Sequence, residues 1–142
     1  MKVRTTSPPV PDLRALAAEG SVHFMGVGGA GMCALAELLL SCGGSITGCD
    51  LKHSQSIQDL GALGVRFSMG HDSGHVVNAS ALVVTSAVPC DHPELVAARD
   101  LGIPVLKRAE ALGAWVNQGK VVAISGTHGK TTTTAMATEI LA

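Results

Sequence analysis

Apolar and polar stretches alternate along residues 21–118 in a pattern that predicts strands followed by helices. Short apolar runs bounded by turn residues predict five strands, at residues 21–27, 45–50, 65–67, 81–88 and 104–107. Apolar residues at helical spacing predict helices at residues 30–41, 54–64, 92–101 and 109–116, with one helical turn within 71–79. Strands that alternate with helices are typical of a parallel sheet covered on both faces. We therefore expect an α/β, Rossmann-like fold with an open parallel sheet of about five strands.

The two ends of the chain depart from this alternation. Three prolines precede a predicted short helix at residues 12–18, so residues 1–20 are predicted to be a flexible leader. Residues 120–126 (KVVAISG) predict a sixth strand, which leads through a Gly- and Thr-rich turn into a helix from Lys130 to Ala142. No stop signal follows that helix. We therefore expect residues 21–118 to form one domain and residues 119–142 to be the truncated opening of a second.

Composition narrows the class of protein. Apolar residues make up 46% of the 142 residues and charged residues 15%, with a net charge of −1 and 17 glycines. This composition favours a folded domain, and its small net charge and two Phe argue against nucleic-acid binding. No apolar run is long enough to cross a membrane. The four cysteines form no C-x-x-C pair, and no secretory signal is evident, so we expect reduced thiols in a cytoplasmic protein.

Residues 26–31 (GVGGAG) match G-x-G-x-x-G in the context that this motif requires, between a predicted strand and a predicted helix. Gly26 permits the sharp turn, Gly28 lets a phosphate approach the backbone, and Gly31 allows close packing of helix and strand. Asp50 ends the second predicted strand, where an acid can bind a ribose or a base. The motif predicts nucleotide binding, and by itself it leaves NAD, NADP, FAD and UDP-sugars open.

A second glycine loop lies at residues 125–132 (SGTHGKTT). It is shorter than the G-x-x-x-x-G-K-[ST] phosphate loop, because Ile124 stands where the first glycine would be. Its chemistry is nonetheless complete, since Lys130 can neutralise phosphate charge and Thr131 can coordinate Mg²⁺. A hydride-transfer enzyme has no use for ATP, so two such loops suggest an ATP-driven reaction on a substrate that carries its own nucleotide.

Several strings, in this order, resemble the Mur ligases. They are His23–Met32 followed by Ala36-Glu37, Ser86-Ala87, His92-Pro93-Glu94, Arg108-Ala109-Glu110 and Ser125–Thr134. The resemblance covers about residues 21–142 and is strongest to the alanine-adding branch of the family, although the peptide-recycling branch stays open. It implies a bacterial peptidoglycan-precursor enzyme, in which ATP phosphorylates the lactyl carboxylate of UDP-N-acetylmuramate and L-alanine attacks the resulting acyl phosphate.

The resemblance also implies which residues form the two sites. For the UDP-sugar it implies Gly28, Gly29, Ala30, Gly31, Met32 and Asp50, and less firmly His71 and Ser86 at the carboxyl edge of the sheet. For ATP it implies Gly126, Thr127, His128, Gly129, Lys130, Thr131 and Thr132, with Lys130 and Thr131 as the catalytic residues and Thr131 near Mg²⁺.

The implied ligands are UDP-N-acetylmuramate, L-alanine, ATP and Mg²⁺, and no NAD is expected. Mur ligases have three domains, so we expect this chain alone to be inactive, and the segment 119–142 to be open to self-association. The alternative functions are a NAD(P)-binding domain of an oxidoreductase and a nucleotide-sensing regulator. Both would use the first loop in the same way but leave Lys130 unexplained.

The remaining histidines and cysteines are given structural interpretations. His23 is predicted to be a core or interface histidine, and Cys33 and Cys42 to be small core residues. His71 and His75 are four residues apart, but no H-E-x-x-H surrounds them, so the spacing alone predicts no metal site.

Overall fold

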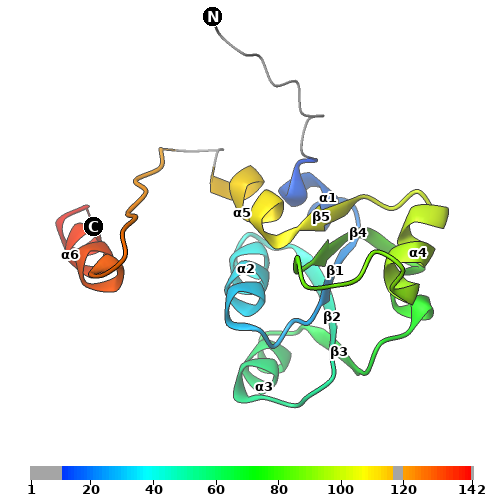
Figure 1. Cartoon of the computed structure of the whole chain (residues 1–142). Helices are drawn as coiled ribbons and strands as arrows, with labels where there is room; N and C mark the ends of the chain where they lie inside the picture. Colours follow the sequence, from blue (N-terminus) through cyan, green and yellow to red (C-terminus); the bar gives the residue numbers. More distant parts are fainter. Residues whose placement is uncertain (1–10, 117–119, 142) are drawn as a thin grey trace, which may run out of the picture.

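The computed structural model describes residues 11–116 and 120–141, and its centre is a five-stranded parallel sheet (Figure 1). The strands are β1 (Ser21–Met25), β2 (Ser45–Asp50), β3 (Arg66–Met69), β4 (Ala79–Val84) and β5 (Val105–Lys107). Their order is β3-β2-β1-β4-β5, and each neighbouring pair is parallel. The predicted α/β class, strand number and open parallel sheet are confirmed.

Helices cover both faces of this sheet. They are α1 (Leu13–Glu19), α2 (Ala30–Ser41), α3 (Gln55–Ala62), the 3₁₀ helix η1 (Ser73–Val76), α4 (Pro93–Asp100), α5 (Arg108–Val116) and α6 (Lys130–Leu141). One core joins α1, α2, α3 and α5 to one face, and a smaller core joins η1 and α4 to the other (Figure 1). Alternation along β1 explains the division, because Val22 and Phe24 enter the larger core while His23 and Met25 face α4.

Side chains that cap the first turn define where several helices begin. Asp12 accepts a hydrogen bond from the Arg14 amide at 2.9 Å and begins α1, and Ser54 accepts one from the Ile57 amide at 3.3 Å and begins α3. Asp91, an acid just before this helix, is also predicted from its residue type to cap α4, and this prediction is wrong. His92 takes that place, since its Nδ1 accepts from the Glu94 amide at 3.3 Å.

Two predicted boundaries also differ. The strand predicted at 81–88 runs from 79 to 84, because residues 85–88 turn and the Val88 amide donates to the Thr85 carbonyl. The helix predicted at 12–18 exists, but it is part of the domain core, since Leu13 and Ala17 are buried. Residues 13–19 therefore do not belong to the predicted leader, and residues 1–10 lie outside the described residues.

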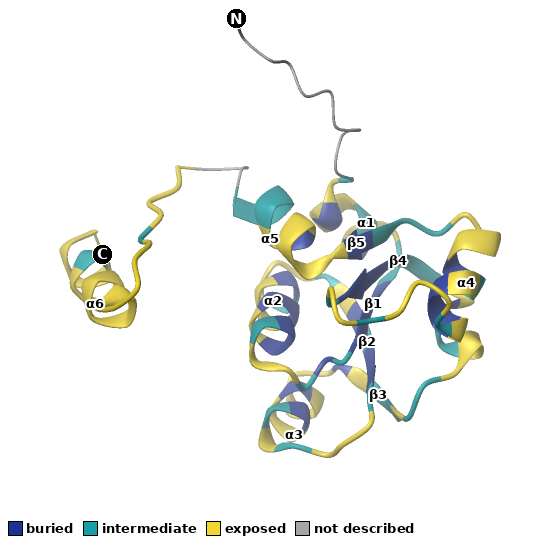
Figure 2. Cartoon of the chain, in the orientation of Figure 1, coloured by how far each residue is buried: buried dark blue, intermediate teal, exposed yellow. Residues whose placement is uncertain are grey.

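Residues 120–126 do not form the predicted strand. A strand needs a hydrogen-bonded neighbour, and no described strand pairs with this segment. Every described residue from 120 to 141 is exposed except the half-buried Ile124 and Ala137 (Figure 2). The segment therefore takes no part in the core of the sheet, although α6 forms close to where the sequence predicts it.

Gly48 in β2 is expected to be essential to this packing. A Cβ added to Gly48 would lie 2.8 Å from both Cβ and Cγ1 of Val27, in the turn after β1. We expect Gly48→Ala to lower the free energy of unfolding by about 1–3 kcal/mol, because a buried side chain would have to move. Denaturant unfolding followed by circular dichroism measures this change.

Gly61→Ala is the matched control. Gly61 is exposed within α3, and an added Cβ would meet nothing within 4 Å. The same substitution there is expected to raise the free energy of unfolding by about 0.5–1 kcal/mol through helix propensity. Equal effects at the two positions would contradict the packing argument.

Candidate functional site

The first glycine loop is a sharp turn between β1 and α2. Gly26 has φ +75°, which an L side chain rarely adopts, and its amide donates to the Cys49 carbonyl at 2.8 Å. Gly29 precedes α2, and its carbonyl accepts from the amides of Met32 and Cys33, both at 2.8 Å. The Ala30 and Gly31 amides come before these two in the first turn of α2, where backbone donors and the helix dipole favour an anion.

Asp50 holds this loop from the end of β2. Its Oδ2 accepts from the Gly28 amide at 3.0 Å, and its Oδ1 accepts from the Lys52 amide at 3.2 Å. A Cβ on Gly28 would lie 3.0 Å from the same carboxylate and 2.9 Å from Ile57 Cδ1. The structure thus brings Gly28 and Asp50 together, as the sequence predicts, and gives Asp50 a positioning role in addition to the predicted uridine contact.

Arg108 is a site residue that the sequence reasoning quoted in a motif but did not select. It begins α5, directly after β5, and its Nη1 would lie 2.6 Å from a Cβ on Gly31. The guanidinium therefore lies against the first turn of α2, next to the glycine loop. A cation at this place would complement an anion at the loop amides. The signal that could have found it is its position directly after a strand of the parallel sheet.

Ser86 lies at the same edge, two residues beyond β4. It lines a cavity of about 430 Å³ with Lys107 and Glu110, and a smaller one of about 150 Å³ with Lys107 and Arg108. The sheet order places β1 and β4 side by side, with their connections running in opposite directions. Open α/β sheets bind ligands outside the carboxyl ends of such a pair. The glycine loop follows one of these strands and Ser86 follows the other.

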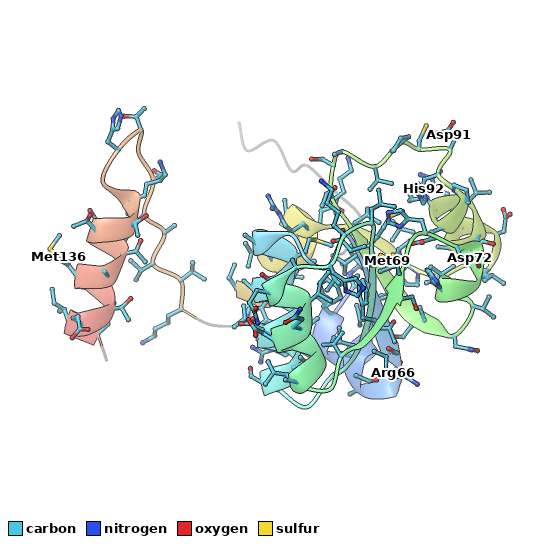
Figure 3. All side chains as sticks on the ribbon, turned by 90° about the horizontal axis from the view of Figure 1, so that it is seen from below. Arg66, Met69, Asp72, Asp91, His92 and Met136 are labelled. Carbon is cyan, nitrogen blue, oxygen red and sulfur yellow. The ribbon has the colours of Figure 1, made fainter. Side chains whose placement is uncertain are left out.

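His71 follows β3 at the same edge, and its Nδ1 contacts two buried side chains. It lies 3.2 Å from Glu94 Oε1 and 3.3 Å from Cys49 Sγ. The structure therefore joins His71 to a buried polar cluster beneath α4, and only its other ring nitrogen is left for the predicted ligand contact. Figure 3 shows Asp72 and His92 on this side of the molecule, close to α4, while Arg66 lies at the far end of β3.

Burial shifts the ionisation of this cluster. The pKa of His23 falls to about 4, mainly because burial disfavours the imidazolium, although Glu94 opposes the shift. Burial, followed by the Glu94 charge, raises the pKa of the Cys49 thiol well above its usual range. His23 is buried, as predicted. Glu94 is fully buried, which the sequence reasoning missed because an acid in the first turn of a helix is usually solvated.

The two cysteines that the sequence predicts in the core, Cys33 and Cys42, differ in burial. Cys33 is buried, as predicted, and burial raises its pKa to about 11. Cys42 is exposed, so the prediction is wrong there. It follows the last residue of α2, where the chain turns away from the core.

The second glycine loop leads into α6. Gly126 has φ +154° and Gly129 has φ +77°, so both glycines adopt backbone conformations that L side chains rarely take. Lys130 Nζ donates back to the carbonyls of Gly126 and, at 3.3 Å, Thr127. Within the described residues, no hydrogen bond joins this loop to the first one. Thr131 and Thr132 lie in the first turn of α6 and are exposed, as are Thr127 and His128.

A search of the described residues for helices that could span a membrane found none.

Comparisons with known proteins agree with this architecture. The sequence model described as "Mur ligase family, catalytic domain" matches residues 21–120. The UDP-N-acetylmuramate–L-alanine ligase of Paenarthrobacter aurescens strain TC1 is 46% identical over 86% of this chain and 27% of its own length. The ligase of the same name from Caulobacter sp. strain K31 is 47% identical over 86% of this chain and 26% of its own length.

Solved structures are similar as well. The UDP-N-acetylmuramate-alanine ligase of Thermotoga maritima has a TM-score of 0.77 at 32% identity, covering 86% of this chain and 29% of that one. A murein peptide ligase from Psychrobacter arcticus 273-4 has a TM-score of 0.78 at 30% identity. The match covers 86% of this chain and 26% of that one. The chain thus spans about a quarter of the length of these relatives. Because the family model matches residues 21–120, the chain belongs to the Mur ligase family.

Proposed function

We propose that residues 21–116 bind the UDP part of UDP-N-acetylmuramate, in a ligase that joins this sugar nucleotide to L-alanine. The observation that carries the proposal is the edge formed by the glycine loop, Asp50 and Arg108. Loop amides and a guanidinium provide donors and positive charge for a diphosphate, and the Asp50 carboxylate beside them would accept a hydrogen bond from a ribose hydroxyl or a base N–H. Ser86 and His71 lie at the same edge and complete the proposed UDP-sugar site.

The names of the curated relatives favour L-alanine as the second substrate, because they are described as UDP-N-acetylmuramate–L-alanine ligases. The structural similarity extends to a murein peptide ligase, so the peptide-recycling reaction is the competing assignment. Family membership favours both over the NAD(P)-binding alternative.

We propose that the second loop, residues 126–132, binds ATP in the whole protein. Its two glycines allow the chain to turn so that backbone amides and Lys130 can surround phosphates. In this structure the Lys130 ammonium bonds to carbonyls of its own loop, which ATP phosphates would replace as partners. Thr131 supplies a hydroxyl, an oxygen ligand of the kind that Mg²⁺ prefers, and the remaining ligands would come from phosphates and water. Bound ATP would activate the sugar carboxylate for attack by the amine.

Self-association through residues 119–142 stays a prediction. Val122, Ile140 and Leu141 are exposed by 69%, 81% and 70%, which is the kind of apolar surface that favours association.

The first test of the UDP-sugar site is a calorimetric titration of the chain with UDP-N-acetylmuramate, UDP and NAD. We expect the two uridine ligands to bind and NAD not to bind. Arg108→Met is expected to weaken the uridine diphosphate affinity at least about tenfold, since a charge-assisted hydrogen bond contributes about 1.5–3 kcal/mol. Arg66→Met is the matched control, because Arg66 is exposed at the amino-terminal end of β3. NAD binding without uridine binding would overturn the proposal.

The loop itself is tested by Gly28→Ala. The added methyl group would displace Asp50 or Ile57, so we expect it to weaken binding of UDP-N-acetylmuramate at least about tenfold, the effect of a loss of about 1.4 kcal/mol. Gly61→Ala, on an exposed face, should bind like the parent chain. Unchanged affinity in a folded Gly28→Ala chain, verified by circular dichroism, would remove this loop from the site.

The roles of the two glycine loops can be tested separately in the full-length ligase that contains this sequence. Lys130→Met is expected to lower the rate of ATP-dependent ligation about 100-fold or more, because a preorganised cation on the phosphates would be lost. The same variant should retain the parent's affinity for UDP-N-acetylmuramate. A coupled assay of phosphate release measures the rate. A ligation rate within about twofold of the parent would contradict the assignment of Lys130.

A further inference from the structure

Four potential metal ligands from four elements meet on the α4 face of the sheet. They are His23 of β1, Cys49 of β2, His75 of η1 and Glu94 of α4, and one ligand atom of each lies within 4.8 Å of all the others. His23 is 2% exposed, Cys49 and Glu94 are fully buried, and the His75 side chain is 19% exposed. The sequence separation of these residues explains why motif reasoning predicts no metal site here.

Several of the distances between potential ligand atoms are close to those of a tetrahedral metal site. His23 Nε2 lies 3.4 Å from Cys49 Sγ and 3.9 Å from Glu94 Oε2, and Cys49 Sγ lies 3.4 Å from the same oxygen. His75 Nδ1 lies 3.3 Å from Glu94 Oε1. Zinc–nitrogen bonds of about 2.0 Å and zinc–sulfur bonds of about 2.3 Å place tetrahedral ligand atoms about 3.3–3.8 Å apart. The remaining pairs of ligand atoms lie within 4.8 Å, so these side chains would draw together around a bound ion.

The donor set selects the kind of metal. A thiolate and two imidazoles suit Zn²⁺ and disfavour Mg²⁺ and Ca²⁺, which prefer oxygen ligands. One thiolate and one carboxylate would also balance the charge of a divalent cation. The cation would in turn compensate the charge of the buried Glu94 carboxylate. A fully buried carboxylate is costly unless such a charge compensates it.

Neighbouring groups orient the proposed ligands. His23 Nδ1 lies 2.8 Å from Thr47 Oγ1, which leaves Nε2 directed at Cys49 and Glu94. The Asp72 amide donates to Glu94 Oε1 at 3.0 Å and fixes the carboxylate. Hydrogen bonds of this kind to the far side of each ligand are typical of metal sites in proteins.

We propose that His23, Cys49, His75 and Glu94 form a Zn²⁺ site that ties η1 and α4 to β1 and β2. None of these four residues is assigned to the UDP-sugar or ATP site, although His71 of the proposed UDP-sugar site contacts Cys49 and Glu94. Because its ligands come from four separate elements, the bound ion would stabilise the fold by linking them.

The test is a titration of the full 142-residue chain, purified without chelators and kept reduced, with Co²⁺ and then Zn²⁺. We expect one Co²⁺ per chain, with a thiolate-to-cobalt charge-transfer band and the intense visible absorption of a tetrahedral ion, both lost when Zn²⁺ displaces Co²⁺. Zn²⁺ should raise the thermal unfolding temperature, because it binds only the folded state.

Variants identify the ligands. Cys49→Ser should abolish the charge-transfer band, and His75→Asn should weaken Zn²⁺ at least about 100-fold, more than loss of an outer hydrogen bond usually costs. His75→Asn keeps the test decisive if Cys49→Ser fails to fold, because His75 is partly exposed. Cys42→Ser, at an exposed cysteine, is the control and should behave like the parent.

Two results would overturn the proposal. The first is no Co²⁺ or Zn²⁺ binding at micromolar concentrations. The second is Co²⁺ binding without a thiolate band, or with one that Cys42→Ser removes and His75→Asn leaves unchanged. Either result would identify the four residues as a hydrogen-bonded polar cluster that holds α4 on the sheet.

Discussion

Parallel pairing of β1 with β2 on one side and β4 on the other is the constraint on which the rest of this structure depends. All five strands point the same way, so every segment that leaves a strand leaves at one edge. The glycine loop, Asp50, His71, Ser86 and Arg108 are separated by up to 82 positions in the sequence, yet all lie at that edge. These candidate site residues are gathered there because parallel strands bring the segments that follow them to one edge.

Close packing keeps that edge in register. Gly48 allows Val27 to approach β2, and the Gly26 and Val27 amides both donate to the Cys49 carbonyl, at 2.8 and 3.1 Å. The turn after β1 is thus fixed to the end of β2 by backbone contacts that involve no ligand. A loop held in this way loses little conformational freedom when an anion binds, which favours affinity.

Signals that are local in the sequence predicted much of this structure. The helix at 30–41 and the strand at 45–50 have the predicted bounds, because a glycine turn and an apolar pattern define each of them. The interactions that were missed are long-range. Nothing near Glu94 in the sequence indicates that η1 and two strand residues surround it, and nothing near Arg108 indicates that its guanidinium reaches Gly31. The strand predicted at 120–126 failed for a related reason, since a strand depends on a partner elsewhere in the chain.

The two candidate sites meet at the end of β2, and strand geometry explains how they stay distinct. Successive side chains of a strand point to opposite faces, so Asp50 reaches the Gly28 amide while Cys49 faces His23 and Glu94. Cys49 also joins the two sites through its backbone, because its carbonyl accepts the glycine-loop amides. Contacts in the buried cluster around Glu94 therefore restrain Cys49, whose carbonyl anchors the glycine loop. A group bound by Cys49 on the α4 face would act on the nucleotide loop by holding β2 in place, without touching the nucleotide.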